Sequence, residues 1–334
     1  MRQKRIRKVS FILRLSGKGF TRFAIGKRKR STLIAAALAL VVSGSAAAIQ
    51  PSQAAAQVSS KASYEAASLS TFSSKFAAGL YSSNAILIDL GNGEVQLKKN
   101  INQKVYPASM TKMMTVLVAL ENLSDPQKKV TLPASIFPDL KKQGASMAGF
   151  LPGEKVKGID LLYGSMLPSG ADASIGLAYA ISGSEAAFVK KMNAKAKKLG
   201  MKHTHFTNVT GLHNANHYTT VKDMSVLMKA ALKNSTFRKL MTTHKYSTAP
   251  TNLHPNGITV RSTLSESAPT LNFKGGRILG GKTGYTRAAG LCLASLAVKN
   301  GREYMLVTAG ADGSPWSKPY HIQDALNVYP KIKN

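Results

Sequence analysis

Residues 105–115, VYPASMTKMMT, place Ser109 at the front of an apolar run, with Lys112 three positions later. From Ser109 to about Leu123, apolar residues recur at steps of three and four, which is the period of a helix with a buried face. Side chains three residues apart on a helix lie on the same face. The stretch therefore predicts a buried helix whose first turn brings the Lys112 amine to the Ser109 hydroxyl.

The segments on both sides of this helix indicate the fold class. Two apolar segments flank Gly91-Asn92-Gly93 and predict a β-hairpin near the start of the domain. A helical middle follows, with helices expected at 159–167, 171–181, 184–200 and 219–233. Three apolar runs then predict adjacent antiparallel strands at 277–281, 290–298 and 304–311, and a last helix is expected at 316–328. We expect an α/β (α+β) domain in which both ends of the chain form one antiparallel sheet flanked by a block of helices.

The first 56 residues predict an export signal. Residues 1–30 hold twelve Lys and Arg and no acidic residue, and an apolar run of seventeen residues and a stretch of small residues follow. The run is shorter than the ~20 residues of a spanning helix, so cleavage is the first interpretation. An uncleaved anchor and a buried helix behind a basic tail are the alternatives. We divide the chain into a signal or anchor (1–56), a linker or first helix (57–80) and a main folded domain (81–334).

Charge and cysteine content limit the partners. Beyond residue 56 the chain holds 34 basic and 15 acidic residues, a net charge of +19. On an exported protein, such a surface meets anionic wall polymers or the membrane surface, whereas nucleic acid is not expected because no recognition motif occurs. The expected location is the extracytoplasmic face of the cell membrane or the cell wall, with secretion if the signal is cleaved. The single Cys292 excludes an intrachain disulfide and is predicted to be a packed thiol.

Two further short motifs can carry chemistry. Ser169 lies in LPSGADAS (167–174), a turn between two apolar segments, where its hydroxyl could face a cleft; an ordinary interhelical turn is the alternative. In GGKTGYT (280–286), Lys282 and Thr283 could hold a carboxylate, and Gly284 would let a substrate backbone approach; a basic hairpin is the alternative. For Ser109 and Lys112 the alternative is a helix cap followed by a solvated lysine.

Together the three motifs favour the catalytic interpretation of each over its structural alternative. Ser-x-x-Lys, Ser-Gly-x and Lys-Thr-Gly occur in the order found in serine penicillin-recognising enzymes. The longer strings VYPASMTKMMT, FTNVTGLHNANHYTT and GGKTGYTRAAGLCLAS add specificity. From about residue 85 to 307, the chain resembles the D-alanyl-D-alanine carboxypeptidases, the low-molecular-weight penicillin-binding proteins. The resemblance implies a β-lactamase/transpeptidase-like fold, peptidoglycan stem peptides as substrates, β-lactams as covalent inhibitors, and no metal or organic cofactor.

The resemblance also implies a role for each motif residue. Ser109 attacks the carbonyl between the two terminal D-alanines, Lys112 takes its proton, and Ser169 relays a proton to the leaving amine. Lys282 keeps the local potential positive, which helps to hold Lys112 neutral. Thr283 and Gly284 lie beside the substrate, where Thr283 helps to bind its terminal carboxylate. The N–H groups of Ser109 and Tyr285 form the oxyanion hole. Water then releases the acyl group.

Two positions need separate expectations. Ala171 stands where the family usually has Asn, and its methyl group cannot form the hydrogen bonds of an amide. The loss of such a positioning group can cost roughly 10²–10³ in rate. We expect a hydrolase; a catalytically impaired penicillin-binding or wall-binding scaffold is the alternative. Lys318, near the last helix, is the candidate for a cation that binds the substrate carboxylate.

A metal site is not expected among the histidines. His203 with His205, and His213 with His217, have spacings that a metal could use, but no carboxylate or cysteine completes either set. We expect a structural or substrate-adjacent role for them. A penicillin-hydrolysing enzyme is disfavoured because no motif with a deacylating Glu follows Ser169.

Overall fold

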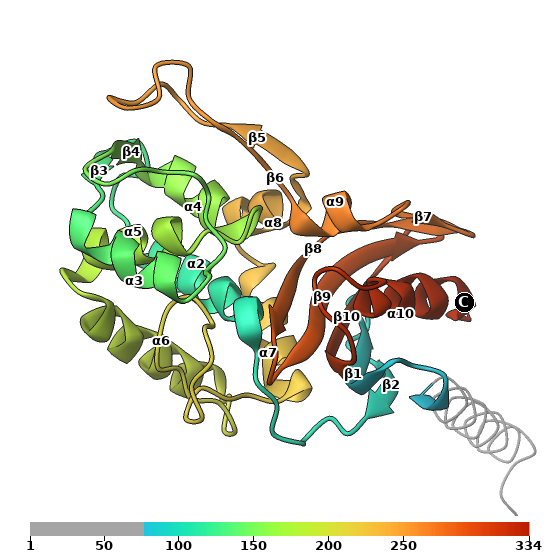
Figure 1. Cartoon of the computed structure of the whole chain (residues 1–334). Helices are drawn as coiled ribbons and strands as arrows, with labels where there is room; N and C mark the ends of the chain where they lie inside the picture. Colours follow the sequence, from blue (N-terminus) through green and yellow to red (C-terminus); the bar gives the residue numbers. More distant parts are fainter. Residues whose placement is uncertain (1–76, 334) are drawn as a thin grey trace, which may run out of the picture. The chain divides into compact units, whose positions relative to one another are not determined.

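The computed structural model describes residues 77–333 (Figure 1). The predicted export signal (1–56) and most of the predicted linker (57–80) lie outside these residues. No helix in the described part of the chain combines the length and the apolar character needed to cross a membrane.

An antiparallel sheet joins the two ends of the domain. Its strands are β1 (Ser82–Asp89), β2 (Val95–Lys99), β7 (Asn272–Phe273), β8 (Gly276–Thr286), β9 (Gly290–Lys299) and β10 (Arg302–Ala311), in the order β2-β1-β10-β9-β8-β7. The predicted hairpin at Gly91–Gly93 is confirmed, because Gly93 (φ +78°) donates its N–H to the Asp89 carbonyl between β1 and β2. The three predicted strands near the C-terminus are also confirmed. The expectation of one sheet built from both ends therefore holds.

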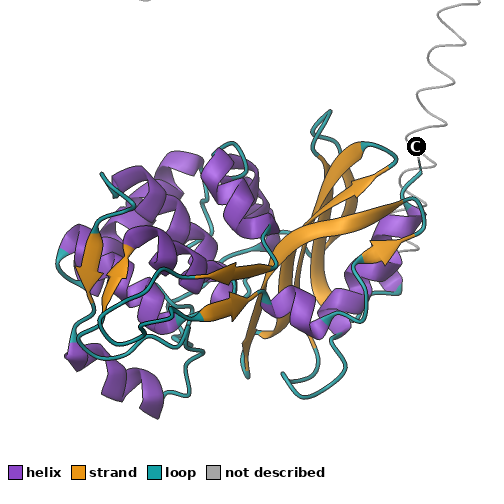
Figure 2. Ribbon diagram, turned by 90° about the horizontal axis from the view of Figure 1, so that it is seen from above, coloured by secondary structure: helices purple, strands orange, loops and turns teal. Residues whose placement is uncertain are grey.

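Both faces of this sheet are buried. In β1, Ile86 and Ile88 pack with the helical block, whereas Ala85 and Leu87 face the other way and pack with the C-terminal helix. Figure 2 shows helices on both sides of the sheet. Burial on both faces explains why the strands appear in the sequence as continuous apolar runs rather than as alternating ones.

The helical block fills the middle of the chain. It holds α2 (Thr111–Asn122), α3 (Phe137–Lys142), α4 (Gly158–Met166), α5 (Ala171–Ser182), α6 (Glu185–Leu199), α7 (Val221–Ala231) and α8 (Ser235–Thr242). Helix α2 lies at its centre, and its residues 111–119 are all buried. Glycines at two helix ends, Gly183 and Gly200, adopt the left-handed conformation that ends a helix without steric cost. The periodic patterns predicted α2, α4, α5, α6 and α7 to within a few residues.

Short elements complete the domain and were not predicted. They are the strand pairs β3 (Lys129–Thr131) with β4 (Lys155–Lys157) and β5 (Lys245–Ser247) with β6 (Thr259–Arg261), the helix α9 (Thr263–Ser267), and the 3₁₀ turns η1 (Ala108–Met110), η2 (Ala134–Ile136) and η3 (Tyr329–Lys331). The last helix, α10 (Tyr320–Val328), begins four residues after the predicted start, because Pro319 fixes its N-terminus. The sequence placed the Lys282-Thr283-Gly284 motif at the end of a strand; it lies within β8.

Candidate active site

Ser109 lies in the 3₁₀ turn that leads into α2, where helical block and sheet meet. The preceding residue, Ala108, has φ +44°, a left-handed conformation that is costly for a residue with a side chain. Two glycines let other backbone segments reach this turn. A Cβ on Gly211 would lie 1.8 Å from the Ala108 carbonyl oxygen, and one on Gly284 would lie 3.0 Å from the Ser109 nitrogen. Close approach to the Ser109 turn therefore requires glycine at position 211 and leaves little room for a side chain at position 284.

Lys112 faces Ser109 one turn along α2. Its ammonium nitrogen lies 3.1 Å from Ser109 Oγ and donates to the Thr210 carbonyl at 2.6 Å. The side chain is 2% exposed. Burial lowers the pKa of Lys112 to about 7, although the charge of Asp172 acts in the opposite direction. A lysine with this pKa is half neutral near pH 7 and can accept a proton from a hydroxyl 3.1 Å away.

Lys282 lies in β8 with its side chain 0% exposed, and its Nζ donates to the Thr283 carbonyl at 3.0 Å. Burial, followed by the positive charge of Lys112, lowers the pKa of Lys282 well below that of a free lysine. The resemblance implied that Lys282 would help to hold Lys112 neutral, but what lowers the pKa of Lys112 is its burial. The positive charge of Lys112 in turn disfavours protonation of Lys282.

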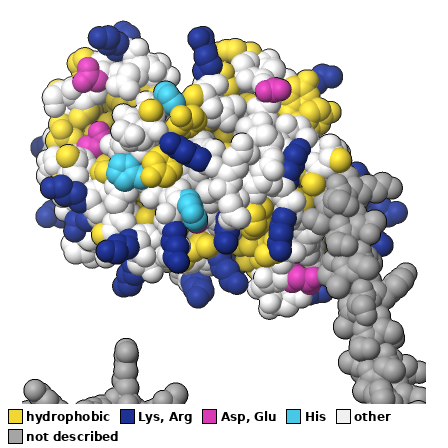
Figure 3. All heavy atoms as spheres, turned by 90° about the horizontal axis from the view of Figure 1, so that it is seen from below, with side chains coloured by type: hydrophobic (Ala, Val, Ile, Leu, Met, Phe, Trp, Pro, Cys, Tyr) yellow, Lys and Arg dark blue, Asp and Glu magenta, His cyan; other side chains and the backbone are white. Residues whose placement is uncertain are grey.

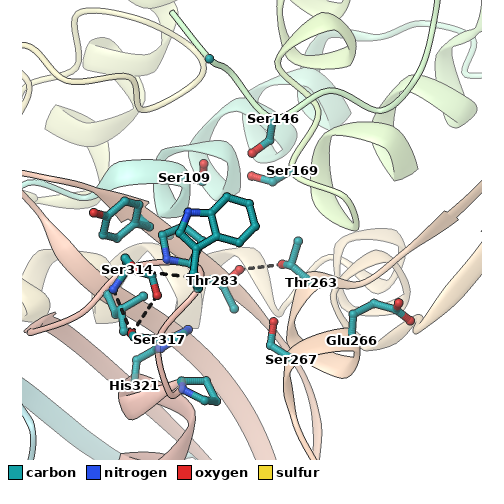
Figure 4. Close-up of a pocket in the computed structure, with 17 residues that line it drawn as sticks. Ser109, Ser146, Ser169, Thr263, Glu266, Ser267, Thr283, Ser314, Ser317 and His321 are labelled. Carbon is teal, nitrogen blue, oxygen red and sulfur yellow. Dashed lines mark hydrogen bonds between the residues drawn. The ribbon is translucent and has the colours of Figure 1, made fainter.

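Ser169 lies in the turn between α4 and α5. Its side chain is 4% exposed, its φ is +66°, and its hydroxyl has no hydrogen-bond partner. A strained residue with an unpaired buried hydroxyl reduces stability, and such residues concentrate at functional sites. Figure 4 shows the hydroxyls of Ser109 and Ser169 at the same cavity. The structure thus brings the predicted Ser169 to the cavity that Ser109 lines.

Asp172 holds the backbone that follows Ser146 in the sequence. Its carboxylate accepts the backbone N–H groups of residues 148–150 at 2.8–3.2 Å. The Ala171 N–H donates to the Ser146 carbonyl at 2.7 Å, so Ser146 is held next to Ser169 (Figure 4). Ser146 lies in a stretch with no motif, and the sequence did not predict it as part of the site.

Two cavities meet at Ser109. The larger, about 680 Å³, is lined by Ser109, Ser169, Thr283, Gly284 and Tyr285 from the predicted set, together with Ser146, Thr263 and the loop before α10. The smaller, about 60 Å³, is lined by Ser109, Lys112 and Ala171 from the predicted set, and by the 210–212 loop. The Thr283 hydroxyl lies 2.6 Å from the hydroxyl of Thr263, a residue of α9 that no sequence signal indicated.

Two predicted site residues, Lys282 and Lys318, line neither cavity. Lys282 is buried, whereas Lys318 is exposed, and the lining of the larger cavity includes its neighbours Ser317 and Pro319. The turn that ends at Ser317 directs these two neighbours inward. The lysine beside Ser109 is instead the buried Lys112.

Among the histidines of the 203–217 segment, His217 has a structural role in this geometry. His217 Nδ1 accepts the Thr207 N–H at 3.0 Å, and its Nε2 lies 2.8 Å from Thr111 Oγ1, next to Lys112. Burial, with smaller contributions from nearby cationic groups, lowers the pKa of His217 to about 4, so the ring stays neutral near pH 7. No group of three or more metal-ligating side chains occurs within residues 77–333.

Cys292 is buried in β9, as predicted, and burial raises the pKa of its thiol to about 12.

Comparison with known proteins agrees with this geometry. The family model of the D-alanyl-D-alanine carboxypeptidases (peptidase S11) matches residues 71–313. A D-alanyl-D-alanine carboxypeptidase of Bacillus subtilis, DacF, is 36% identical over 68% of this chain, and the match spans 57% of that relative. One from Streptomyces strain K15 is 36% identical over 64% of this chain and 75% of the relative.

Solved structures give the same result for the fold. The crystal structure of the Streptomyces K15 DD-transpeptidase matches with a TM-score of 0.65 and 30% identity over 74% of this chain and 94% of that one. Penicillin-binding protein 5 of Haemophilus influenzae matches with a TM-score of 0.63 and 26% identity over 74% and 70%. The predicted β-lactamase/transpeptidase-like fold is therefore confirmed.

Proposed function

Because the chain belongs to the D-alanyl-D-alanine carboxypeptidase family, we propose that it is a serine carboxypeptidase that removes the terminal D-alanine of peptidoglycan stem peptides through an acyl-enzyme on Ser109. The observation that carries this proposal is the buried pair of Lys112 Nζ and Ser109 Oγ, 3.1 Å apart. The chain spans little more than half of its Bacillus relative, so the activity is assigned to the part that holds this pair.

The reaction begins with the stem peptide in the larger cavity. Neutral Lys112 takes the Ser109 proton as Oγ attacks the carbonyl carbon between the two D-alanines. The backbone N–H groups of Ser109 and Tyr285 donate to the developing oxyanion in this proposal. Thr283 binds the terminal carboxylate, and its bond to Thr263 orients its hydroxyl.

The proton then moves to the leaving amine. The hydroxyl of Ser169 has no protein partner and faces the cavity, so it is free to pass the proton that Lys112 received. The carbon–nitrogen bond breaks and D-alanine leaves with that proton. Water, activated by the same lysine, attacks the ester carbonyl and regenerates Ser109.

Ala171 leaves this machinery in place. It lies at the smaller cavity, and the distance between Lys112 and Ser109 does not depend on an amide at position 171. Family membership gives no support to the alternative of an impaired scaffold. A penicillin should acylate Ser109 in the same way as the substrate and leave slowly.

The test is release of D-alanine from diacetyl-L-Lys-D-Ala-D-Ala by the purified protein, with Ser109→Ala as the control. We expect release by the wild type and none by S109A. A folded wild type that releases no D-alanine would contradict the proposal. Rapid turnover of penicillin without peptide cleavage would indicate a β-lactamase instead.

We also propose that the protein is exported and acts at the membrane or wall, where its basic surface contacts phosphate groups. The support is the basic N-terminal segment before the apolar run and the net charge of +19 beyond residue 56. Figure 3 shows Lys and Arg side chains spread over one face, with few acidic ones among them. Sedimentation with anionic lipid vesicles and, separately, with walls that bear teichoic acid distinguishes lipid phosphate from wall phosphate as the group bound. Binding to either should weaken as salt rises.

A further inference from the structure

The larger cavity has a second wall that the chemistry at Ser109 does not use. Hydroxyl groups of Ser109, Ser169, Thr263 and Thr283 line one side of the cavity, whereas the loop between β10 and α10 contributes Pro315, Trp316 and Pro319 together with Ser314 and Ser317. Figure 4 shows Ser314 and Ser317, which flank Pro315 and Trp316 in the sequence, across the cavity from Ser146 and Ser169. A ligand in the cavity therefore meets hydroxyl groups on one side and, on the other, an indole and proline rings flanked by two serines.

Trp316 is 93% exposed, whereas the other exposed large apolar residues described, Tyr81, Leu151 and Leu253, are 42–52% exposed. It is also the single tryptophan of the chain. An aromatic side chain can bury about 150–250 Å² against a partner. A nearly bare indole at the edge of a catalytic cavity leaves all of this area for a ligand.

The backbone beneath the indole is held in place. The Ser314 N–H donates to Ser317 Oγ at 2.9 Å, and the Ser317 hydroxyl donates to the Ser314 carbonyl, also at 2.9 Å. The Trp316 N–H donates to Ser314 Oγ at 3.3 Å. Pro315 further restricts the turn. Binding a ligand against the indole therefore orders one side chain rather than a whole loop, which lowers the entropic cost.

The two cavities decide which part of the substrate meets this wall. Thr283, which binds the carboxylate, lines only the larger cavity, and the smaller one holds Lys112 and Ala171. With the carbonyl carbon at Ser109, the C-terminal residue must therefore extend toward Thr283, into the cavity that Trp316 lines. About 680 Å³ is far more than the single methyl group of alanine requires.

We propose that Trp316 forms an apolar subsite for the side chain of the departing C-terminal residue, so that the enzyme also releases D-residues with larger apolar side chains. This inference rests on the proposed function. The residue's carboxylate lies at Thr283 and its side chain packs on the indole. Trp316 is a specificity residue, since it contacts the substrate but takes no part in proton transfer.

The test uses peptides that differ only in the departing residue: diacetyl-L-Lys-D-Ala-D-Xaa, where Xaa is D-Ala, D-Leu or D-Phe. The full chain is compared with W316A, W316F and the control L253A, which removes an exposed apolar side chain outside the cavity lining. The readout is the ratio of kcat/KM for the D-Leu peptide to that for the D-Ala peptide. Apolar groups in a pocket change such ratios by about tenfold or more.

We expect the wild type to release D-leucine with a kcat/KM within about tenfold of that for D-alanine. W316A should lower the ratio about tenfold, mainly through KM, while W316F should restore most of it and L253A should leave it unchanged. A ratio that W316A does not move would overturn the inference. So would a wild type that releases D-alanine but no D-leucine. By contrast, a folded wild type that releases no residue and forms no penicilloyl ester would refute the proposed function itself.

Fluorescence gives a second readout, because all indole emission comes from Trp316. Acylation by benzylpenicillin leaves the ring that bears the antibiotic's carboxylate on the Thr283 side of the cavity. The emission should move to shorter wavelength as the indole loses water. Unchanged emission on a fully acylated protein would count against the subsite.

Discussion

The pH dependence of Ser109 acylation follows from the burial of Lys112. With a pKa of about 7, the neutral fraction of Lys112 is about one tenth at pH 6 and about nine tenths at pH 8. If neutral Lys112 is the base, the second-order rate constant for acylation by penicillin should rise about tenfold between these values and then level off. A lysine with an ordinary pKa near 10.5 would instead give a rate that keeps rising about tenfold per pH unit through pH 9.

The assay is the rate of penicilloyl-enzyme formation from pH 5 to 9.5, followed by intact-protein mass spectrometry. Lys112→Arg is the control, because arginine stays charged throughout this range and should acylate slowly at every pH. Asp172→Asn makes the test sharper. The carboxylate of Asp172 raises the pKa of Lys112, so its removal should move the midpoint below pH 7.

D172N must first be shown to fold, since Asp172 accepts three backbone N–H groups and an amide cannot replace them all. A wild-type rate that still rises above pH 8.5, or a midpoint that moves upward in folded D172N, would refute the reasoning about Lys112.

Three further predictions follow from the geometry. Ser169→Ala removes a buried, unpaired hydroxyl, so melting temperature should hold while D-alanine release falls at least about 100-fold; a large loss of melting temperature would indicate a structural role instead. Gly211→Ala would place a Cβ 1.8 Å from the Ala108 carbonyl oxygen, so urea denaturation should show a loss of at least about 2 kcal/mol, and an unchanged midpoint would contradict the close approach. The Cys292 thiol, with a pKa of about 12, should react with a disulfide reagent at pH 8 only in denaturant; fast labelling of the native protein would refute its burial.

The elements that the sequence predicted are those whose burial leaves a regular pattern. Helix α2 has a helical period, and β9 is a continuous apolar run because both faces of the sheet are covered. The motif residues Ser109, Lys112 and Ser169 could be placed together because the family resemblance supplied contacts that spacing alone does not. Helix boundaries were predicted less well: α10 begins later than expected because a single proline, Pro319, sets its first residue.

The remaining site residues could not be predicted, because their contacts are distant in sequence. The Thr210 carbonyl accepts a hydrogen bond from Lys112, which lies 98 positions away in the sequence. The Thr263 hydroxyl contacts that of Thr283, but Thr263 lies in a short helix that no sequence motif marks. The turn at Ala108 and Ser109 lies against two glycines from other parts of the chain, Gly211 and Gly284. Lys318 was predicted because it is a positively charged residue near the last helix. The direction of its side chain depends on the turn at residues 314–317, which the sequence did not indicate.

The central claim is that Ser109 is a nucleophile activated by Lys112, and one measurement tests it most directly. Purified protein is incubated with penicillin and, separately, with a D-Ala-D-Ala pentapeptide, and both are analysed by mass spectrometry with peptide mapping. The account predicts a stable penicilloyl adduct on Ser109, absent from S109A, and loss of one D-alanine from the peptide. A folded protein with no adduct on Ser109 and an intact pentapeptide would contradict it.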